Sequence, residues 1–359
     1  MLNIKSGTLS ATLSTYQETD GTALQQITLE NGIITVQLIN LGATITSIHT
    51  PDRTGSNKNI VAGFPHPHNY RDNPAYFGST VGRYANRIAG GRLTIGNMHY
   101  QLPVNNGNNH LHGGVDGFHK KAWQVTSCTE NEEQAAVTME YVSRTGEEGY
   151  PGTLTVHVTY ALDLHNRLSI LYMAYTDQAT VVSLTNHSYF NLTGFEQPLV
   201  TDHLLRINAT AYTEKNDNNT PTGQILPVAG TPLDFTSFTP LGTNIDLLTA
   251  DGGFDHNYVL DHASSPSGNP ATPAAELEDP SSGRFVQVFT DQPGLQLYSA
   301  NYWDGSLTGA HGRAYLRHGA VALETQAFPD SPNQPHFPNT ILRPGEIYKR
   351  ETVFAFGVR

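Results

Sequence analysis

Apolar and polar residues alternate with a period of two wherever this sequence is periodic. Residues 154–162 carry Leu, Val, Val, Tyr and Leu at every second position, and residues 168–174 repeat the pattern after the interruption Asp163-Leu164-His165-Asn166. This alternation is typical of strands with one buried face, and the interruption predicts a hairpin with those four residues as its loop. Residues 34–38 alternate in the same way.

No window of about ten residues carries the apolar spacing of an amphipathic helix, and only residues 245–248 favour a short helical turn. The chain contains 33 glycines and 21 prolines, as many short strands joined by turns require. The sequence therefore predicts an all-β fold of antiparallel strands.

The number of domains follows less directly from the sequence. A length of 359 residues would suit two domains of about 150 residues, but all-β architectures often exceed that size as one unit. The Pro- and Ser-rich segment 263–282 has strand-like sequence on both sides, so we interpret it as an exposed loop rather than a linker. We predict a single domain over residues 1–359.

Composition argues against several kinds of partner. The formal net charge is −12, a sign that disfavours nucleic acid and anionic membrane surfaces. No segment approaches the run of about 18 apolar residues that spans a membrane, and no signal-peptide pattern is visible. The single cysteine, Cys128, excludes an intrachain disulfide and a CxxC motif. We therefore expect a cytoplasmic protein that binds neither nucleic acid nor membrane.

The segment GRYANRI places Arg83, Asn86 and Arg87 within five residues of one another. Guanidinium and amide groups form fixed hydrogen bonds that suit vicinal hydroxyls or carboxylates. The alternative is that both arginines pair with acidic neighbours at the surface. From local sequence, either role is open for each of them.

A second segment, His110-Leu111-His112-Gly113-Gly114, carries two histidines that would share a face in an extended chain. That spacing is also how β-barrel metal sites present a histidine pair. A hydrogen-bonded loop histidine is the favoured interpretation of His110. The paired glycines permit close backbone approach to a ligand and make His112 the better candidate.

Residues 183–192, SLTNHSYFNL, fit a half-buried strand but set an amide, an imidazole and a hydroxyl side by side. The neighbours of His187 could fix its tautomer and orientation for catalysis, or His187 could be a structural histidine. Glu324 ends the apolar run 320–323, where a carboxylate is costly unless it is paired or used. Asp255 and Gln296 are further candidates at predicted turn or strand-end positions.

These segments, in this order, resemble the galactose mutarotase or aldose 1-epimerase family. The resemblance runs from about Phe77 to Phe356 through the motifs GRYANRI, LHGGVDGF, GYPGTL, SLTNHSYFNLTG, PTGQILPVAGTPLDF, GFDHNYVL, TDQPGLQLYSAN and LETQAFPDSPNQ. It implies a large antiparallel β-sandwich with a sugar cleft on its concave sheet. It also implies interconversion of the α and β anomers of free aldohexoses, such as galactose and glucose, without cofactor or metal.

The resemblance also implies roles for individual residues. His187 is similar to the family's general acid, and Glu324 is similar to its general base. Arg87, His112, Asp255 and Gln296 resemble the groups that hold sugar hydroxyls, and Asn86 resembles a helper. The segment 263–282 is longer than usual for the family. For the sugar complex we predict that the nearby carboxylate charge raises the pKa of His187.

Other functions remain open at the level of sequence. One is a non-catalytic carbohydrate-binding or regulatory protein on the same fold. Another is a metal-dependent isomerase with His110, His112, His187 and Glu324 as ligands. Epimerisation of a phosphorylated hexose would need a basic cluster, for which only Arg83 and Arg87 are candidates. The sequence leaves open which aldose is preferred, and whether the protein is a monomer or a homodimer.

Overall fold

The computed structural model of the chain describes residues 8–17, 23–261 and 272–359. Within these residues the strands form large antiparallel sheets, which confirms the predicted all-β class. The largest sheet has nine strands in the order β11-β12-β13-β14-β30-β24-β23-β18-β21. Their bounds are β11 Gln124–Glu130, β12 Gln134–Ser143, β13 Leu154–Asp163, β14 Arg167–Thr176, β30 Tyr348–Val358, β24 Arg284–Thr290, β23 Ala275–Glu278, β18 Leu204–Ile207 and β21 Thr239–Pro240.

A six-stranded sheet, in the order β17-β28-β25-β22-β19-β20, carries the residues of interest. Its strands are β17 Tyr189–Phe190, β28 Val321–Gln326, β25 Gly294–Tyr298, β22 Asp255–Val259, β19 Ala211–Lys215 and β20 Pro221–Pro227. A five-stranded sheet pairs β1 Ser10–Gln17, β2 Ala23–Glu30, β3 Thr35–Ile39, β4 Thr44–Pro51 and β5 Asn57–Asn59 in chain order.

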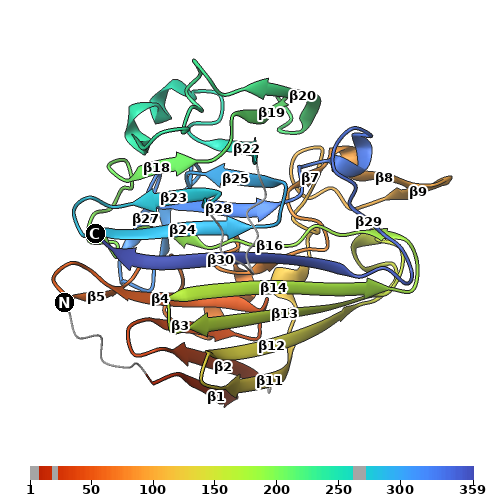
Figure 1. Cartoon of the computed structure of the whole chain (residues 1–359). Helices are drawn as coiled ribbons and strands as arrows, with labels where there is room; N and C mark the ends of the chain where they lie inside the picture. The colour runs from red at the N-terminus through yellow and green to blue at the C-terminus, as the bar shows by residue number, and fades with distance from the viewer. Residues whose placement is uncertain (1–7, 18–22, 262–271) are drawn as a thin grey trace.

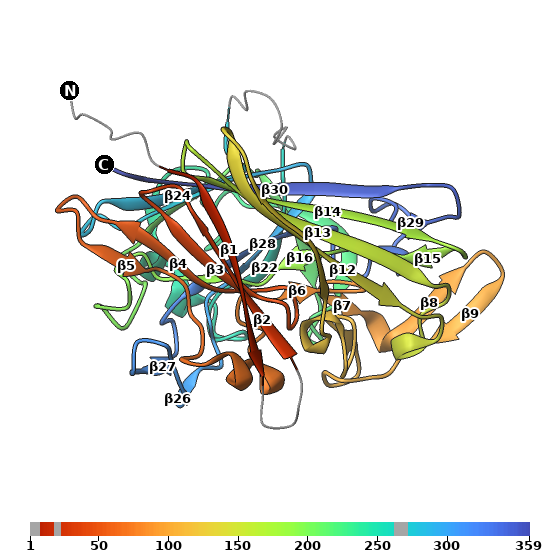
Figure 2. The ribbon, with the colours of Figure 1, turned by 90° about the horizontal axis from the view of Figure 1, so that it is seen from below.

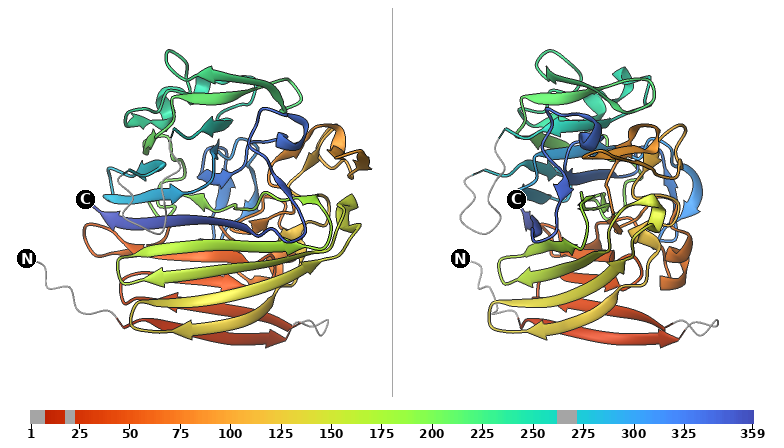
Figure 3. Two further views of the ribbon diagram at one scale, coloured as in Figure 1. Left: turned by 45° about the vertical axis from the view of Figure 1, so that its right-hand side comes forward. Right: turned by 90° about the vertical axis from the view of Figure 1, so that its right-hand side faces the viewer.

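The sheets pack through their apolar faces. Figure 1 shows the long strands of the nine-stranded sheet across the front of the molecule, and Figure 2, seen from below, shows β1–β4 on the other side of β12–β14. The views in Figure 3 show the same two layers. Strand β2 contacts β12 and β13, and β4 contacts β30. One core cluster joins side chains from all three sheets, among them Ile27, Val158, Leu297 and Phe354, which is why alternate positions on these strands are apolar.

Short elements complete the described part of the chain. The two-stranded pairs are β6 Thr80–Val81 with β16 Thr185–Asn186, β7 Arg87–Ile88 with β10 His110–Leu111, β8 Arg92–Ile95 with β9 Met98–Gln101, β15 Thr180–Val181 with β29 Ile341–Leu342, and β26 Asp304–Thr308 with β27 Ala314–Leu316. The 3-10 helices are η1 Pro67–Asp72, η2 Ala89–Gly91, η3 Phe118–Lys120, η4 Glu147–Gly149, η5 Leu241–Thr243, η6 Ile245–Leu247 and η7 Ser331–Asn333. None of the described residues lies in a helix long and apolar enough to span a membrane.

Several local predictions are confirmed. Strands β13 and β14 pair antiparallel as the predicted hairpin, although Asp163 ends β13 and leaves residues 164–166 as the loop. Residues 35–39 form β3, and η6 supplies the short helical turn. The predicted loop 263–282 is wrong in part, because residues 275–278 form β23 between β18 and β24. Residues 262–271 lie outside the described residues. The single-domain interpretation stays a prediction.

The half-buried strand predicted for residues 183–192 is also wrong. The segment is buried throughout and forms only two strands of two residues each, β16 and β17, besides isolated bridges at Ser183 and Phe190. Asn186 explains the break, because its side chain donates to the carbonyl oxygen of Gly78 and accepts from the backbone and hydroxyl of Ser188. Side chains that bond to nearby backbone groups compete with a sheet ladder.

Arg83 has a role that neither sequence interpretation anticipated. Its side chain is buried rather than paired at the surface. Both terminal nitrogens donate to backbone carbonyl oxygens, among them those of Ser143, Pro151 and Gly152 at 2.9–3.1 Å. Burial lowers the pKa of Arg83 to about 10, which still leaves it charged at neutral pH. Arg83 therefore ties three chain segments together instead of binding a ligand.

Candidate active site

The floor of a cleft is formed by three neighbouring strands of the six-stranded sheet. Asn257 of β22 lies opposite Gln296 of β25, and Gln296 lies opposite Glu324 of β28. Because alternate residues of a strand share a face, Asp255 faces the same side as Asn257. Asp255 begins its strand as predicted, whereas Gln296 lies in the middle of β25 rather than at a strand end.

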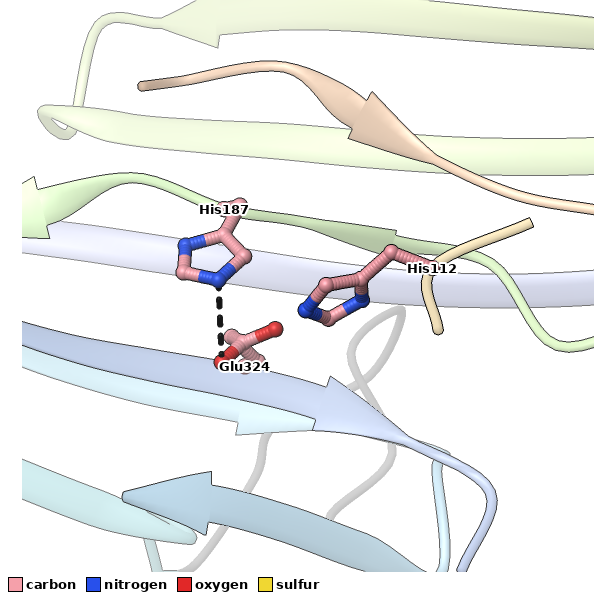
Figure 4. A group of neighbouring side chains, drawn as sticks. All are labelled: His112, His187 and Glu324. Atoms are coloured by element: carbon pink, nitrogen blue, oxygen red, sulfur yellow. Dashed lines mark ion pairs between the residues drawn. The ribbon is translucent and has the colours of Figure 1, made fainter. Parts of the chain in front are cut away.

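His187 reaches the same point from the segment between β16 and β17. Its backbone is held by a hydrogen bond from its N–H to the carbonyl oxygen of Ser79 and by one from the N–H of Gly78. Nε2 of His187 is 3.4 Å from Oε1 of Glu324, and the two side chains are only 4% and 3% exposed. Figure 4 shows this pair and the ring of His112 beside the same carboxyl group. The structure thus brings together the predicted acid and base, whose roles stay predictions.

His112 is held by Asn86 in a reciprocal pair of hydrogen bonds. The N–H of Asn86 donates to Nδ1 of His112, and the N–H of His112 donates to the carbonyl oxygen of Asn86, both at 3.1 Å. A ring nitrogen that accepts from an N–H carries no proton, so the neutral ring has its proton on Nε2. Burial, together with the neighbouring His187 and Arg87, keeps the pKa of His112 well below its usual range.

The two histidines of the second segment do not share a face. His112 has a φ of 52° and leaves the extended conformation of β10. The ring of His110 is used in the fold, with hydrogen bonds to the carbonyl oxygen of Pro103 and the hydroxyl of Tyr150. His110 is therefore the hydrogen-bonded histidine that the sequence favoured, and it does not line the cleft.

The glycines after His112 have a different purpose from the predicted one. A side chain at Gly113 would lie 1.8 Å from the carbonyl oxygen of Gly82, and one at Gly114 would meet Glu148. Both residues have positive φ angles of 83° and 106°, which suit glycine. They allow close packing against the protein itself rather than close approach to a ligand.

Arg87, Asp255 and Gln296 form one hydrogen-bonded wall of the cleft. Nε2 of Gln296 donates to Oδ1 of Asp255 at 2.7 Å, and an Arg87 nitrogen lies 3.9 Å from Oδ2 of Asp255. Arg87 also donates to Oδ1 of Asn106 at 3.1 Å. Since its side chain is only 11% exposed, Arg87 faces the cleft instead of forming the surface ion pair that was its alternative.

Burial dominates the electrostatics of the central pair. It raises the pKa of Glu324 well above its usual range, and the negative charge of Asp255 adds to this effect. Burial also lowers the pKa of His187 to about 4, against a smaller opposing effect of Asp255. In the sugar-free pair, burial therefore favours the neutral form of both groups, with the proton on Glu324 rather than on His187. The raised pKa predicted for His187 in the sugar complex stays a prediction.

The walls of the cleft are aromatic, and sequence reasoning missed them. The cavity has a volume of about 360 Å³, and its lining includes Tyr76, Tyr189, Tyr298 and Trp303. The ring of Tyr189 stacks on that of His187, with 4.7 Å between the ring centroids. Tyr189 and Tyr298 each follow a candidate residue, His187 and Gln296, by two positions, which is the one signal that could have found them. Tyr76 has a φ of 58°, and no pattern in the sequence predicts this backbone conformation.

Known proteins similar to this chain were found by sequence and by structure. The sequence model of the family Aldose 1-epimerase matches residues 25–355. Galactose mutarotase of Mus musculus is 43% identical over 338 residues, which cover 94% of this chain and 95% of that protein. Aldose 1-epimerase of Escherichia coli (strain K12) is 36% identical and covers 94% and 96%. The structure of galactose 1-epimerase from Lactobacillus acidophilus NCFM has a TM-score of 0.84 at 29% identity and covers 98% and 99%.

A large antiparallel fold, together with a polar cleft that has aromatic walls and a buried imidazole–carboxyl pair, defines a class of carbohydrate enzyme. Within that class, the extent of the sequence match decides the family. The chain belongs to the aldose 1-epimerase family and is an isomerase. The resemblance drawn from the motifs is thereby confirmed.

Proposed function

We propose that this protein is an aldose 1-epimerase that interconverts the α and β anomers of free aldohexoses such as galactose and glucose. One observation carries the chemistry: Nε2 of His187 and Oε1 of Glu324 lie 3.4 Å apart in a cleft of about 360 Å³. Opening a cyclic hemiacetal removes a proton from the anomeric hydroxyl and delivers one to the ring oxygen. Because both oxygens are bonded to the same carbon, the base and the acid must lie side by side, within about 3 Å of their oxygens.

In this proposal Glu324 accepts the proton of the anomeric hydroxyl and His187 protonates the ring oxygen. Burial favours the proton on Glu324 rather than on His187 in the sugar-free site, so substrate binding has to shift it toward His187. A hydrogen bond from the anomeric hydroxyl favours this shift, because donors stabilise the carboxylate form. Rotation about the C1–C2 bond of the open sugar exposes the other carbonyl face. The two groups then exchange roles and close the ring to either anomer.

The remaining predicted residues hold the sugar in this proposal. Nε2–H of His112 donates to a hydroxyl, while Asp255, Gln296 and Arg87 form the wall that recognises further hydroxyls. Asn86 acts through His112, whose tautomer it fixes. That tautomer also argues against the metal-dependent alternative, because a protonated Nε2 cannot ligate a metal.

We expect chelation to leave the activity intact. Purified protein should accelerate the mutarotation of freshly dissolved α-D-galactose or α-D-glucose, followed by polarimetry, equally with and without EDTA. The physical reason is that both proton transfers are assigned to side chains of the chain itself. A loss of rate in EDTA that added Zn²⁺ restores would instead support His112, His187 and Glu324, whose ligand atoms lie within 4.8 Å of one another, as a metal centre.

The pH dependence of kcat/KM should show the unusual pKa values of the free enzyme. With one proton shared by the pair, the rate should rise through a pH of about 4, where His187 loses its proton in the free site. It should then stay level until Glu324, whose pKa is raised, deprotonates. A lower limb near the ordinary histidine value of about 6.5 would contradict this assignment. For the sugar complex, the upper limb of kcat should lie above about 6.5.

A non-catalytic carbohydrate-binding or regulatory protein is the second candidate function. It would bind aldoses in the same cleft without accelerating mutarotation, and His187→Ala would change affinity alone. We also propose a cytoplasmic location, in keeping with the single Cys128. The monomer or homodimer predicted from the sequence is open to size-exclusion chromatography with light scattering.

A further inference from the structure

Lys215 lies next to the sugar site, with its Nζ 3.9 Å from Oδ2 of Asp255. It is the last residue of β19, and it does not line the main cavity. Together with Asp255 and Gln296 it lines a separate cavity of about 20 Å³. Its side chain is only 16% exposed. Lys215 is therefore placed to act on Asp255 without touching a sugar in the main cavity.

All three ammonium hydrogens of Lys215 have acceptors. Nζ donates to Oδ1 of Asp251 at 2.6 Å, to Oδ1 of Asn219 at 2.8 Å and to the backbone carbonyl oxygen of Asp255 at 2.8 Å. It is also 3.9 Å from Oδ2 of the Asp255 carboxylate. Because each of its three N–H groups has an acceptor, the ammonium group of Lys215 is held in one orientation. Lys215 thus fixes both the backbone and the charge environment of Asp255.

The carboxylate of Asp255 has few charged neighbours. Arg87 faces it from β7, and Lys215 faces it from β19. His256 is the next residue on β22, its Nδ1 accepts from the N–H of Asp255, and burial lowers its pKa to about 4. Glu324 from β28 and Tyr298 from β25 are further neighbours; burial raises the pKa of each, and the negative charge of Asp255 adds to this effect. The positive charges that face the Asp255 carboxylate are those of Lys215 and Arg87.

We propose that Lys215 is a positioning residue, which holds Asp255 ionised and in place so that Asp255 can bind a sugar hydroxyl. Burial opposes ionisation of Asp255, yet its pKa is lowered, with Lys215 as the largest favourable contribution and Arg87 as the next. Without Lys215, burial would prevail, and Asp255 would take up a proton at mildly acidic pH. This inference rests on the proposed function, because it concerns the same sugar site.

The test compares KM for D-galactose at pH 5 and pH 8 in wild type and in Lys215→Gln. Glutamine can still hydrogen-bond Asp251 or the carbonyl of Asp255, so the variant removes the charge and not every contact. We expect the KM of wild type to stay level, and that of Lys215→Gln to rise about tenfold at pH 5 and much less at pH 8. Without the Lys215 charge, a smaller share of Asp255 is ionised at pH 5 than at pH 8, so fewer molecules offer the carboxylate to the sugar. The ratio of kcat values should change less than the ratio of KM values.

Two further variants separate charge from bulk. Lys215→Arg keeps the positive charge and should preserve the level KM, although loss of the three-acceptor geometry raises its value at both pH values. Lys349→Gln removes an exposed lysine of β30 and should behave as wild type. Circular dichroism and thermal melting report whether each variant is folded.

Equal KM values for wild type and Lys215→Gln at both pH values would overturn the inference, even if the variant melts at a lower temperature. A KM of wild type that already rises at pH 5 would also overturn the inference, because Lys215 would then fail to keep Asp255 ionised. This result can be obtained even if Lys215→Gln does not fold. If wild type accelerates no aldose, the proposed function fails. Calorimetric titration with D-galactose then makes the pH 5 and pH 8 comparison without turnover.

Discussion

Glu324→Gln should abolish most of the mutarotase activity while leaving the protein folded. General acid–base groups contribute about 10²- to 10⁴-fold to rate, and glutamine can neither accept nor release the proton. Glutamine has the shape of the protonated carboxyl that burial favours in the sugar-free site. We therefore expect kcat to fall by about 10³-fold, with little change in KM or in melting temperature. Polarimetry with α-D-galactose, corrected for the uncatalysed rate, measures the effect.

The double variant Glu324→Gln/His187→Asn provides the matched control. Residues that act as a unit show effects that are far from additive, so the second substitution should cost little further rate. If the losses multiply instead, His187 and Glu324 act independently and the shared-proton mechanism is wrong. If Glu324→Gln retains more than about a tenth of the wild-type kcat, Glu324 is not the catalytic base.

The sequence predicted the class of fold because burial of one strand face leaves a period of two in the chain. It predicted the hairpin of β13 and β14 because both partners and their turn are contiguous. It could not predict that β30, residues 348–358, would pair with β14 on one side and β24 on the other. Alternation specifies which face of a strand is buried but not its neighbour, so partners distant in sequence stay undetermined.

The candidate residues were found because polar side chains interrupt apolar segments, as at His187 and Glu324. Their 3.4 Å separation depends on the path of the segment between β16 and β17, which local sequence does not specify. The positive φ of His112 likewise turns its ring away from the face of His110. Lys215 gave no signal, because a lysine at the end of a strand next to polar residues is ordinary at a protein surface.

Arg83→Met should cause the largest loss of stability among these variants. The substitution preserves much of the side-chain volume, but it leaves carbonyl groups of Ser143, Pro151 and Gly152 without their donor. Each unsatisfied buried group costs about 1–3 kcal/mol, and methionine cannot donate to any of these three carbonyl oxygens. We expect the free energy of unfolding to fall by about 3–5 kcal/mol, a large part of the about 5–15 kcal/mol typical of a domain. Urea denaturation followed by tryptophan fluorescence measures it.

Arg92→Met is the control for this prediction, because Arg92 is an exposed arginine on β8, and surface substitutions usually change stability by less than about 0.5 kcal/mol. Folded Arg83→Met should keep its affinity for galactose, since Arg83 contacts the backbone of residues 143–152 and not the cleft. A variant as stable as wild type but with weakened sugar binding would reverse this conclusion. It would mean that Arg83 serves the substrate, as its motif first allowed, and that the neighbouring carbonyl groups find other donors.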